Sequence, residues 1–147
     1  MLCQTPGIAD LPLTGGCLCG RVRFELAAAP TGAGYCHCTR CQGRTGSGAS
    51  AQARVDGDAF RLVAGEDAVK GWRHPDGGFV KYFCPECGAH LFSRNPDDPS
   101  QMSVRMAAFD EDPGVRPSWR AHVASAASWE PLPDDGLERY EGSPPRF

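Results

Sequence analysis

The chain has 147 residues, a length that fits one domain with a core of its own. Its 15 basic and 18 acidic side chains give a formal net charge of -3, which disfavours a duplex-binding module. No uncharged apolar run reaches about 18 residues, and the start lacks the pattern of a signal peptide. We therefore expect a cytoplasmic protein without nucleic-acid or membrane partners, and the sequence leaves its oligomeric state open.

The first part of the chain predicts an irregular lead-in and then a strand. Residues 1–12 contain two prolines and no periodicity, so we expect a segment that packs weakly. Arg21–Leu26 alternates apolar and charged side chains, which is the period of a half-buried strand. Three glycines bracket the first pair of cysteines and predict turns: Gly15, Gly16 and Gly20.

The middle and end of the chain predict further short strands and little helix. Ser47–Val55 predicts a strand of small residues, and at most one helical turn fits before it, near Thr39–Gln42. Turn residues separate five more strand candidates: Phe60–Val63, Val69–Trp72, Phe79–Phe83, His90–Ser93 and Met102–Met106. Arg120–Ala124 predicts a last strand, and residues 131–147 predict an extended surface tail. The expected architecture is one mainly β domain over residues 13–130, built of several small sheets around metal.

The eight cysteines indicate metal rather than disulfides, because we expect an unsecreted protein and seven of them fall into short clusters. Neighbouring thiols converge on one ion far more easily than they bond to each other. The remaining cysteine, Cys3, stands alone. The clusters are Cys17-Leu-Cys19, Cys36-His-Cys38-Thr-Arg-Cys41 and Cys84-Pro-Glu-Cys87.

The Cys84-Pro-Glu-Cys87-Gly segment is typical of a zinc knuckle, which supplies two of the four ligands of a tetrahedral site. Cys17 and Cys19 are the leading candidates to complete it, since residues two apart on an extended strand point to the same side. The alternative is that these cysteines are buried free thiols.

The triple of Cys36, Cys38 and Cys41 fills three corners of a tetrahedron and leaves the fourth to water, a substrate or a histidine. An open fourth corner is what catalysis requires. One alternative is a closed site with a histidine as fourth ligand, from the set His37, His74, His90 and His122. Another is a zinc ribbon in which Cys38 and Cys41 join the 84/87 knuckle.

Three residues beside this triple are candidates for supporting roles. Arg40 and Arg44 flank Cys41 and suit a substrate carboxylate, although exposed arginines are also common on solvated surfaces. His37 is placed in sequence for proton transfer, but alternation along an extended Cys-His-Cys segment turns its ring away from the metal. We therefore expect His37 to support the site from behind the ligands or to be structural.

Three sequence blocks resemble the glutathione-dependent formaldehyde-activating (GFA) family, which also includes centromere protein V. They are Gly15-Gly-Cys-Leu-Cys-Gly-Arg-Val-Arg-Phe24, Cys36-His-Cys-x-x-Cys-Gln42 and Phe83-Cys-Pro-Glu-Cys-Gly-Ala-x-Leu-Phe92. The resemblance continues into Ala126-Ala-Ser-Trp129 and covers most of the chain from about residue 13.

The resemblance implies a fold of coiled antiparallel sheets and two Zn²⁺ sites. A structural zinc is implied at Cys17, Cys19, Cys84 and Cys87, and a catalytic zinc at Cys36, Cys38 and Cys41. It also implies carbon–sulfur lyase chemistry, in which a thiol such as glutathione adds to formaldehyde to give an S-hydroxymethyl adduct, or the reverse. The rival interpretation is a non-catalytic zinc module that binds a protein partner.

Overall fold

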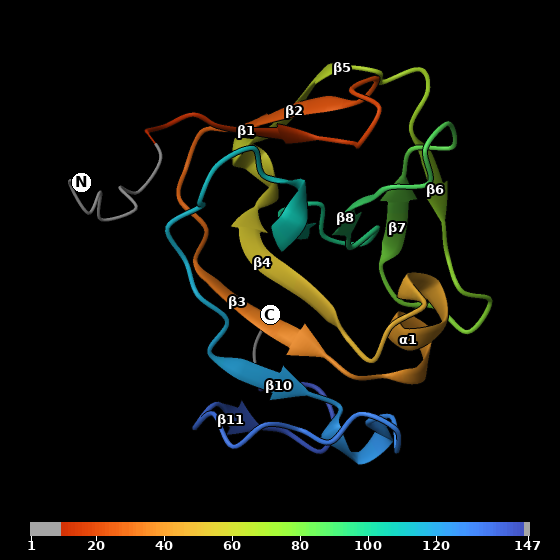
Figure 1. The fold of residues 1–147 in the computed structure, drawn as a ribbon. Helices are drawn as coiled ribbons and strands as arrows, with labels where there is room; N and C mark the ends of the chain where they lie inside the picture. The colour runs from red at the N-terminus through yellow and green to blue at the C-terminus, as the bar shows by residue number, and fades with distance from the viewer. Residues whose placement is uncertain (1–9, 146–147) are drawn as a thin grey trace.

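The computed structural model describes residues 10–145, and these form two β-sheets with little helix (Figure 1). The smaller sheet has the strand order β1-β2-β5, with β1 (Leu13–Gly16), β2 (Arg23–Leu26) and β5 (Phe60–Ala64). The larger sheet has eight strands in the order β11-β10-β3-β4-β9-β8-β7-β6. Their bounds are β3 Gly32–Cys36, β4 Ser50–Asp56, β6 Lys70–Trp72, β7 Val80–Phe83, β8 His90–Arg94, β9 Gln101–Arg105, β10 Trp119–Ala121 and β11 Glu138–Arg139.

Neighbouring strands are antiparallel except that β10 runs parallel to both β3 and β11. The α-helix in the described range, α1 (Thr39–Thr45), connects β3 to β4. Single turns of 3-10 helix occupy Gly57–Ala59, Met106–Ala108 and Val123–Ser125. No helix of residues 10–145 is long and apolar enough to cross a membrane. The prediction of a mainly β domain with little helix is confirmed.

The core forms where apolar side chains of both sheets meet. In β2 the predicted alternation is confirmed, because Phe24 and Leu26 are almost fully buried while Arg23 and Glu25 are only half-buried. The Phe24 ring packs 5.2 Å from that of Phe60. From the large sheet come buried residues of β4, β8 and β9: Ala53, Val55, Leu91, Phe92, Met102 and Val104. Burial of each large apolar side chain contributes about 1.5–3 kcal/mol.

Two expectations about local structure are wrong, and one strand was not predicted. The helix α1 spans seven residues rather than one turn, because Cys38 caps its start and Gly46, with φ of 66°, ends it. Gly15 and Gly16 belong to β1 rather than to a turn. The strand β3 was not expected, since its glycines have low strand propensity.

Gly34 in β3 is explained by its neighbour across the sheet. Trp119 of β10 pairs with Gly34, and a Cβ atom at Gly34 would lie 2.1 Å from the Trp119 indole. Glycine is therefore required for β10 to approach β3 closely. This places the carboxyl end of β3, where the second cysteine cluster begins, beside β10 and the tail (Figure 1). The lead-in at residues 1–9 lies outside the described residues.

Candidate metal centres and the adjoining cavity

Four cysteines from distant parts of the chain converge on one point. Their sulfur atoms all lie within 4.8 Å of one another: Cys17, Cys19, Cys84 and Cys87. The Sγ of Cys19 lies 3.6 Å from that of Cys17 and 3.8 Å from that of Cys84. A tetrahedral ion with metal–sulfur bonds of about 2.3 Å, the length found for zinc, separates its sulfur ligands by about 3.8 Å. The donor set and its spacing therefore fit a zinc ion.

Backbone amides around this four-sulfur cluster favour thiolates. The N–H of Val22 donates to the Sγ of Cys17 at 3.2 Å. Backbone hydrogen bonds from Ala89 and then Cys19 lower the pKa of Cys87 to about 6. Gly88 follows the knuckle with φ of 75°, a conformation that L side chains rarely adopt. The knuckle predicted from Pro85 and Gly88 is therefore preformed to hold a cation.

A second cluster gathers Cys36, Cys38 and Cys41, whose sulfur atoms also lie within 4.8 Å of one another. Cys36 ends β3, Cys38 is the N-cap of α1 and Cys41 lies in the first turns of that helix. The N–H of Cys41 donates to the Sγ of Cys38 at 3.3 Å. Hydrogen bonds from the Cys36 and Cys38 thiols, and a further one from Ser50, lower the pKa of Cys41.

The second cluster has three donors where the first has four. Within residues 10–145, no further cysteine, histidine or carboxylate joins Cys36, Cys38 and Cys41 in a common group. The cysteines are thus divided 17/19/84/87 and 36/38/41, not in the alternative zinc-ribbon arrangement. Three thiols suit a zinc ion and leave one tetrahedral position to another molecule.

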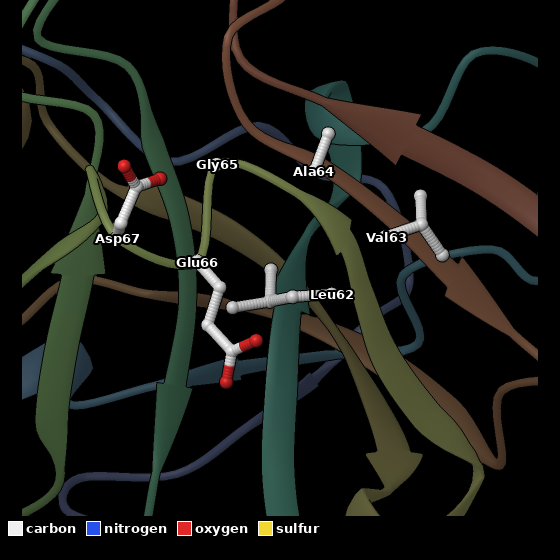
Figure 2. Close-up of a pocket in the computed structure, with 6 residues that line it drawn as sticks. All are labelled: Leu62, Val63, Ala64, Gly65, Glu66 and Asp67. Carbon is white, nitrogen blue, oxygen red and sulfur yellow. The ribbon is translucent and has the colours of Figure 1, made fainter.

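The three-cysteine cluster opens on a cavity of about 590 Å³, and all three of its cysteines line that cavity. The walls come from α1, from strands β3, β4, β7 and β10, and from the tail through Ser143 and Pro144. A second hollow beyond β5 is lined by Leu62, Val63, Ala64, Gly65, Glu66 and Asp67 (Figure 2). That hollow contains none of the predicted site residues and offers no thiol or imidazole.

Both candidate arginines lie beside this cavity. Arg40 and Arg44 project from α1, and a helix brings residues four apart onto one face. The Nη1 of Arg40 donates to the carbonyl of Gly77 at 2.7 Å. The Arg44 guanidinium lies 5.8 Å from the centre of the Trp72 ring, which also lines the cavity.

His37 does not line the cavity. Its ring is buried, and the Nη1 of Arg120 lies 3.2 Å from its Nε2. The other arm of Arg120 donates to Asp135 of the tail at 2.6 Å. Burial and the positive charge of Arg120 lower the pKa of His37, so the ring is neutral at pH 7. The structure thus places His37 behind the cysteines, on the side that holds the tail.

The other three histidines are divided between cavity and surroundings. His74 and His122 line the cavity, whereas His90 does not. His122 has φ of 55°, and its Nε2 lies 3.1 Å from the Ser143 hydroxyl. A histidine in the left-handed region carries strain, which often occurs at functional sites.

Sequence reasoning missed the polar floor of the cavity. The Ser103 hydroxyl donates to the Oε1 of Gln52 at 3.1 Å and lies 2.7 Å from the Ser93 hydroxyl. Gln52, Ser93 and Ser103 come from three adjacent strands and all line the cavity. Serine and glutamine at buried positions of predicted strands were the available signal. Lys81 and Arg54 were also missed, because each lies alone in its strand sequence.

The comparisons with known proteins agree with this arrangement. A crystal structure of a Rhodobacter sphaeroides protein from a structural genomics programme has a similar fold, with a TM-score of 0.53 and 24% sequence identity. The alignment covers 86% of this chain and 98% of that one. The model of the family described as glutathione-dependent formaldehyde-activating enzyme matches residues 12–125, a range that contains all seven clustered cysteines. Since this match extends over most of the chain, the protein belongs to the GFA family.

Proposed function

We propose that this protein is a zinc-dependent carbon–sulfur lyase that forms or cleaves the adduct of a small thiol and an aldehyde, with glutathione and formaldehyde as the model pair. The observation that carries the proposal is the opening of Cys36, Cys38 and Cys41 onto a cavity of about 590 Å³. A closed four-ligand site would instead favour a non-catalytic binding module, and the described residues supply three ligands. The four-sulfur cluster is proposed as the structural zinc site.

In the forward direction the thiol sulfur forms a bond to the aldehyde carbon, the C=O π electrons move to oxygen, and that oxygen takes up the proton lost by the thiol. Zinc bound at the three-cysteine cluster supplies Lewis acidity and a preference for thiolate sulfur near neutral pH. The cavity cations Arg40 and Arg44 bind substrate carboxylate. The floor of the cavity offers hydroxyl and amide groups that can form hydrogen bonds with the adduct oxygen: those of Gln52, Ser93 and Ser103.

The proposal is tested by two-dimensional exchange NMR with ¹³C-formaldehyde and glutathione. We expect the zinc-loaded protein to accelerate exchange between hydrated formaldehyde and the S-hydroxymethyl adduct by at least about 100-fold over the buffer reaction, a typical contribution of positioned catalytic groups. Protein stripped of both metals is the control. An exchange rate equal to that of buffer for glutathione and for several other thiols would contradict the proposed activity.

His37 offers a second test, because we propose it as a positioning residue rather than as a proton carrier. His37→Gln removes a ring that Arg120 contacts, and the loss of one buried hydrogen bond costs about 1–3 kcal/mol, or roughly 2–10 °C in melting temperature for a chain of this size. We expect turnover of the purified, folded variant to stay within about threefold of wild type below its melting temperature. A fall of 100-fold or more, with an altered pH profile, would instead identify His37 as the general base.

A further inference from the structure

The charged side chains that line the cavity are all basic. Four of its lining residues are cations: Arg40, Arg44, Arg54 and Lys81. No aspartate or glutamate is among the described residues that line it. Three thiolates with one Zn²⁺ carry a net charge of about -1, so the surroundings of the open position remain strongly positive. The net charge of the whole chain is negative, whereas the charged side chains that line this cavity are basic.

Arg44 is the cavity cation with unsatisfied hydrogen-bond donors. Its Nε and Nη1 atoms are buried and have no hydrogen-bond acceptor within the described residues. Leaving such buried donors unpaired is unfavourable, and more so when the group is charged. Arg44 lies one helical turn after Cys41, and both residues line the cavity. An acceptor supplied by a ligand would remove this cost.

Lys81, on β7, lines the same cavity. Burial lowers its pKa, the negative charge of Cys41 opposes that shift, and the positive charges of Arg105 and Arg44 add to it. No carboxylate of residues 10–145 forms an ion pair with Arg40, Arg44 or Lys81. Two partly desolvated cations that line one cavity without a carboxylate partner are unfavourable unless an anion joins them.

The basic lining also disfavours a ligand that carries an ammonium group. An ammonium in the cavity would be desolvated among cations and would find no described carboxylate to pair with. Glutathione carries two carboxylates and one ammonium at neutral pH. Building on the proposed function, we infer that the physiological thiol of this site is polyanionic and has no ammonium group, so that the cavity binds thiol carboxylic acids in preference to aminothiols.

A matched pair of ligands tests this inference: glutathione and glutaryl-cysteinyl-glycine, which differs from it only by the missing amino group. Binding to the metal-loaded protein is measured by calorimetry, and entry of sulfur is measured by the thiolate bands of a protein carrying Co²⁺ at the three-cysteine cluster. We expect the desamino ligand to bind at least about tenfold more tightly, the effect of one unfavourable charge contact of about 1.4 kcal/mol. We also expect both ligands to change the cobalt spectrum.

Arg44→Gln tests the named cation. The variant keeps a hydrogen-bond donor but loses the charge, and we expect it to bind the desamino ligand at least about tenfold more weakly. Arg61→Gln is the matched control, since Arg61 lies in the small sheet, pairs with Glu25 and does not line the cavity. We expect no change in affinity for that variant.

The outcomes separate the inference from the proposed function. Equal affinities of the two ligands, or tighter binding of glutathione, would overturn the inference and leave the proposed function in place if the cobalt spectrum responds. A calorimetric preference for the desamino ligand without any spectral response would support the anion-selective cavity and contradict the thiol chemistry. Absence of both signals would overturn both.

Discussion

Replacing Cys84 by serine is expected to release one of two metal ions and to unfold most of the domain. Cys84 is fully buried within the main hydrophobic core. Its cluster ties Cys17 and Cys19, which follow strand β1 of the small sheet, to the end of β7 in the large sheet. Structural zinc contributes about 10–16 kcal/mol in small zinc domains, whereas a whole domain is stable by only about 5–15 kcal/mol. Loss of this ion therefore removes most of the available stability.

The measurement is metal content by elemental analysis together with thermal unfolding followed by circular dichroism. We expect wild type to hold two ions and to unfold cooperatively, and Cys84→Ser to hold at most one and to show no cooperative transition. A matched comparison is Cys38→Ser, which removes a ligand of the other cluster. Retention of two ions and of a wild-type melting temperature by Cys84→Ser would contradict a structural role for the four-sulfur cluster.

The metal ligands were predictable from the sequence because short thiol spacing is a local property. Two cysteines three apart, or two apart on a strand, reach one ion whatever the rest of the fold does. The partition into a four-sulfur and a three-sulfur cluster could not be predicted from spacing alone, because Cys19 and Cys84 are 65 residues apart in the sequence. The family resemblance supplied that pairing, and the positions of the sulfur atoms agree with it.

The secondary structure shows where local patterns fail. Gly43 has a low helix propensity, yet it lies inside α1, because the helix is fixed at its ends by Cys38 and Gly46 and by the packing of Cys41. The glycines of β3 have a low strand propensity, yet Gly34 is needed for Trp119 to cross it. In α1 the caps and the buried Cys41, and in β3 a tertiary contact, outweigh an intrinsic propensity of about 1 kcal/mol per glycine.

The cavity could not be predicted from local sequence patterns. Its cations come from separate elements, Arg44 on α1, Lys81 on β7 and Arg54 on β4. Each looks like an ordinary surface residue in its own segment. Only the order of the strands, which places β7 and β4 in the same sheet and α1 beside it, brings these charges into the cavity that the three cysteines line. Sequence reasoning named Arg40 and Arg44 solely because they flank Cys41.

Replacing Cys38 by serine is expected to abolish thiol-adduct turnover while leaving the domain folded. Cys38 has two roles, since its sulfur belongs to the three-cysteine cluster and accepts the N–H of Cys41 at the start of α1. Serine is a favoured N-cap, so the substitution keeps the helix start and removes only the thiolate. With two thiols left, we expect the variant to retain one ion and a melting temperature within a few degrees of wild type, and to lose at least about 100-fold in exchange rate.

Cys38→Ala completes this comparison, because alanine removes the cap as well as the ligand. We expect it to match the serine variant in metal content and turnover but to be less stable by about 1 kcal/mol, the usual cost of losing an N-cap. If Cys38→Ser kept both ions and full turnover, the three-cysteine cluster would not be the catalytic centre. If Cys38→Ser unfolded like Cys84→Ser, both clusters would have a structural role, because the loss of either ion would then unfold the domain.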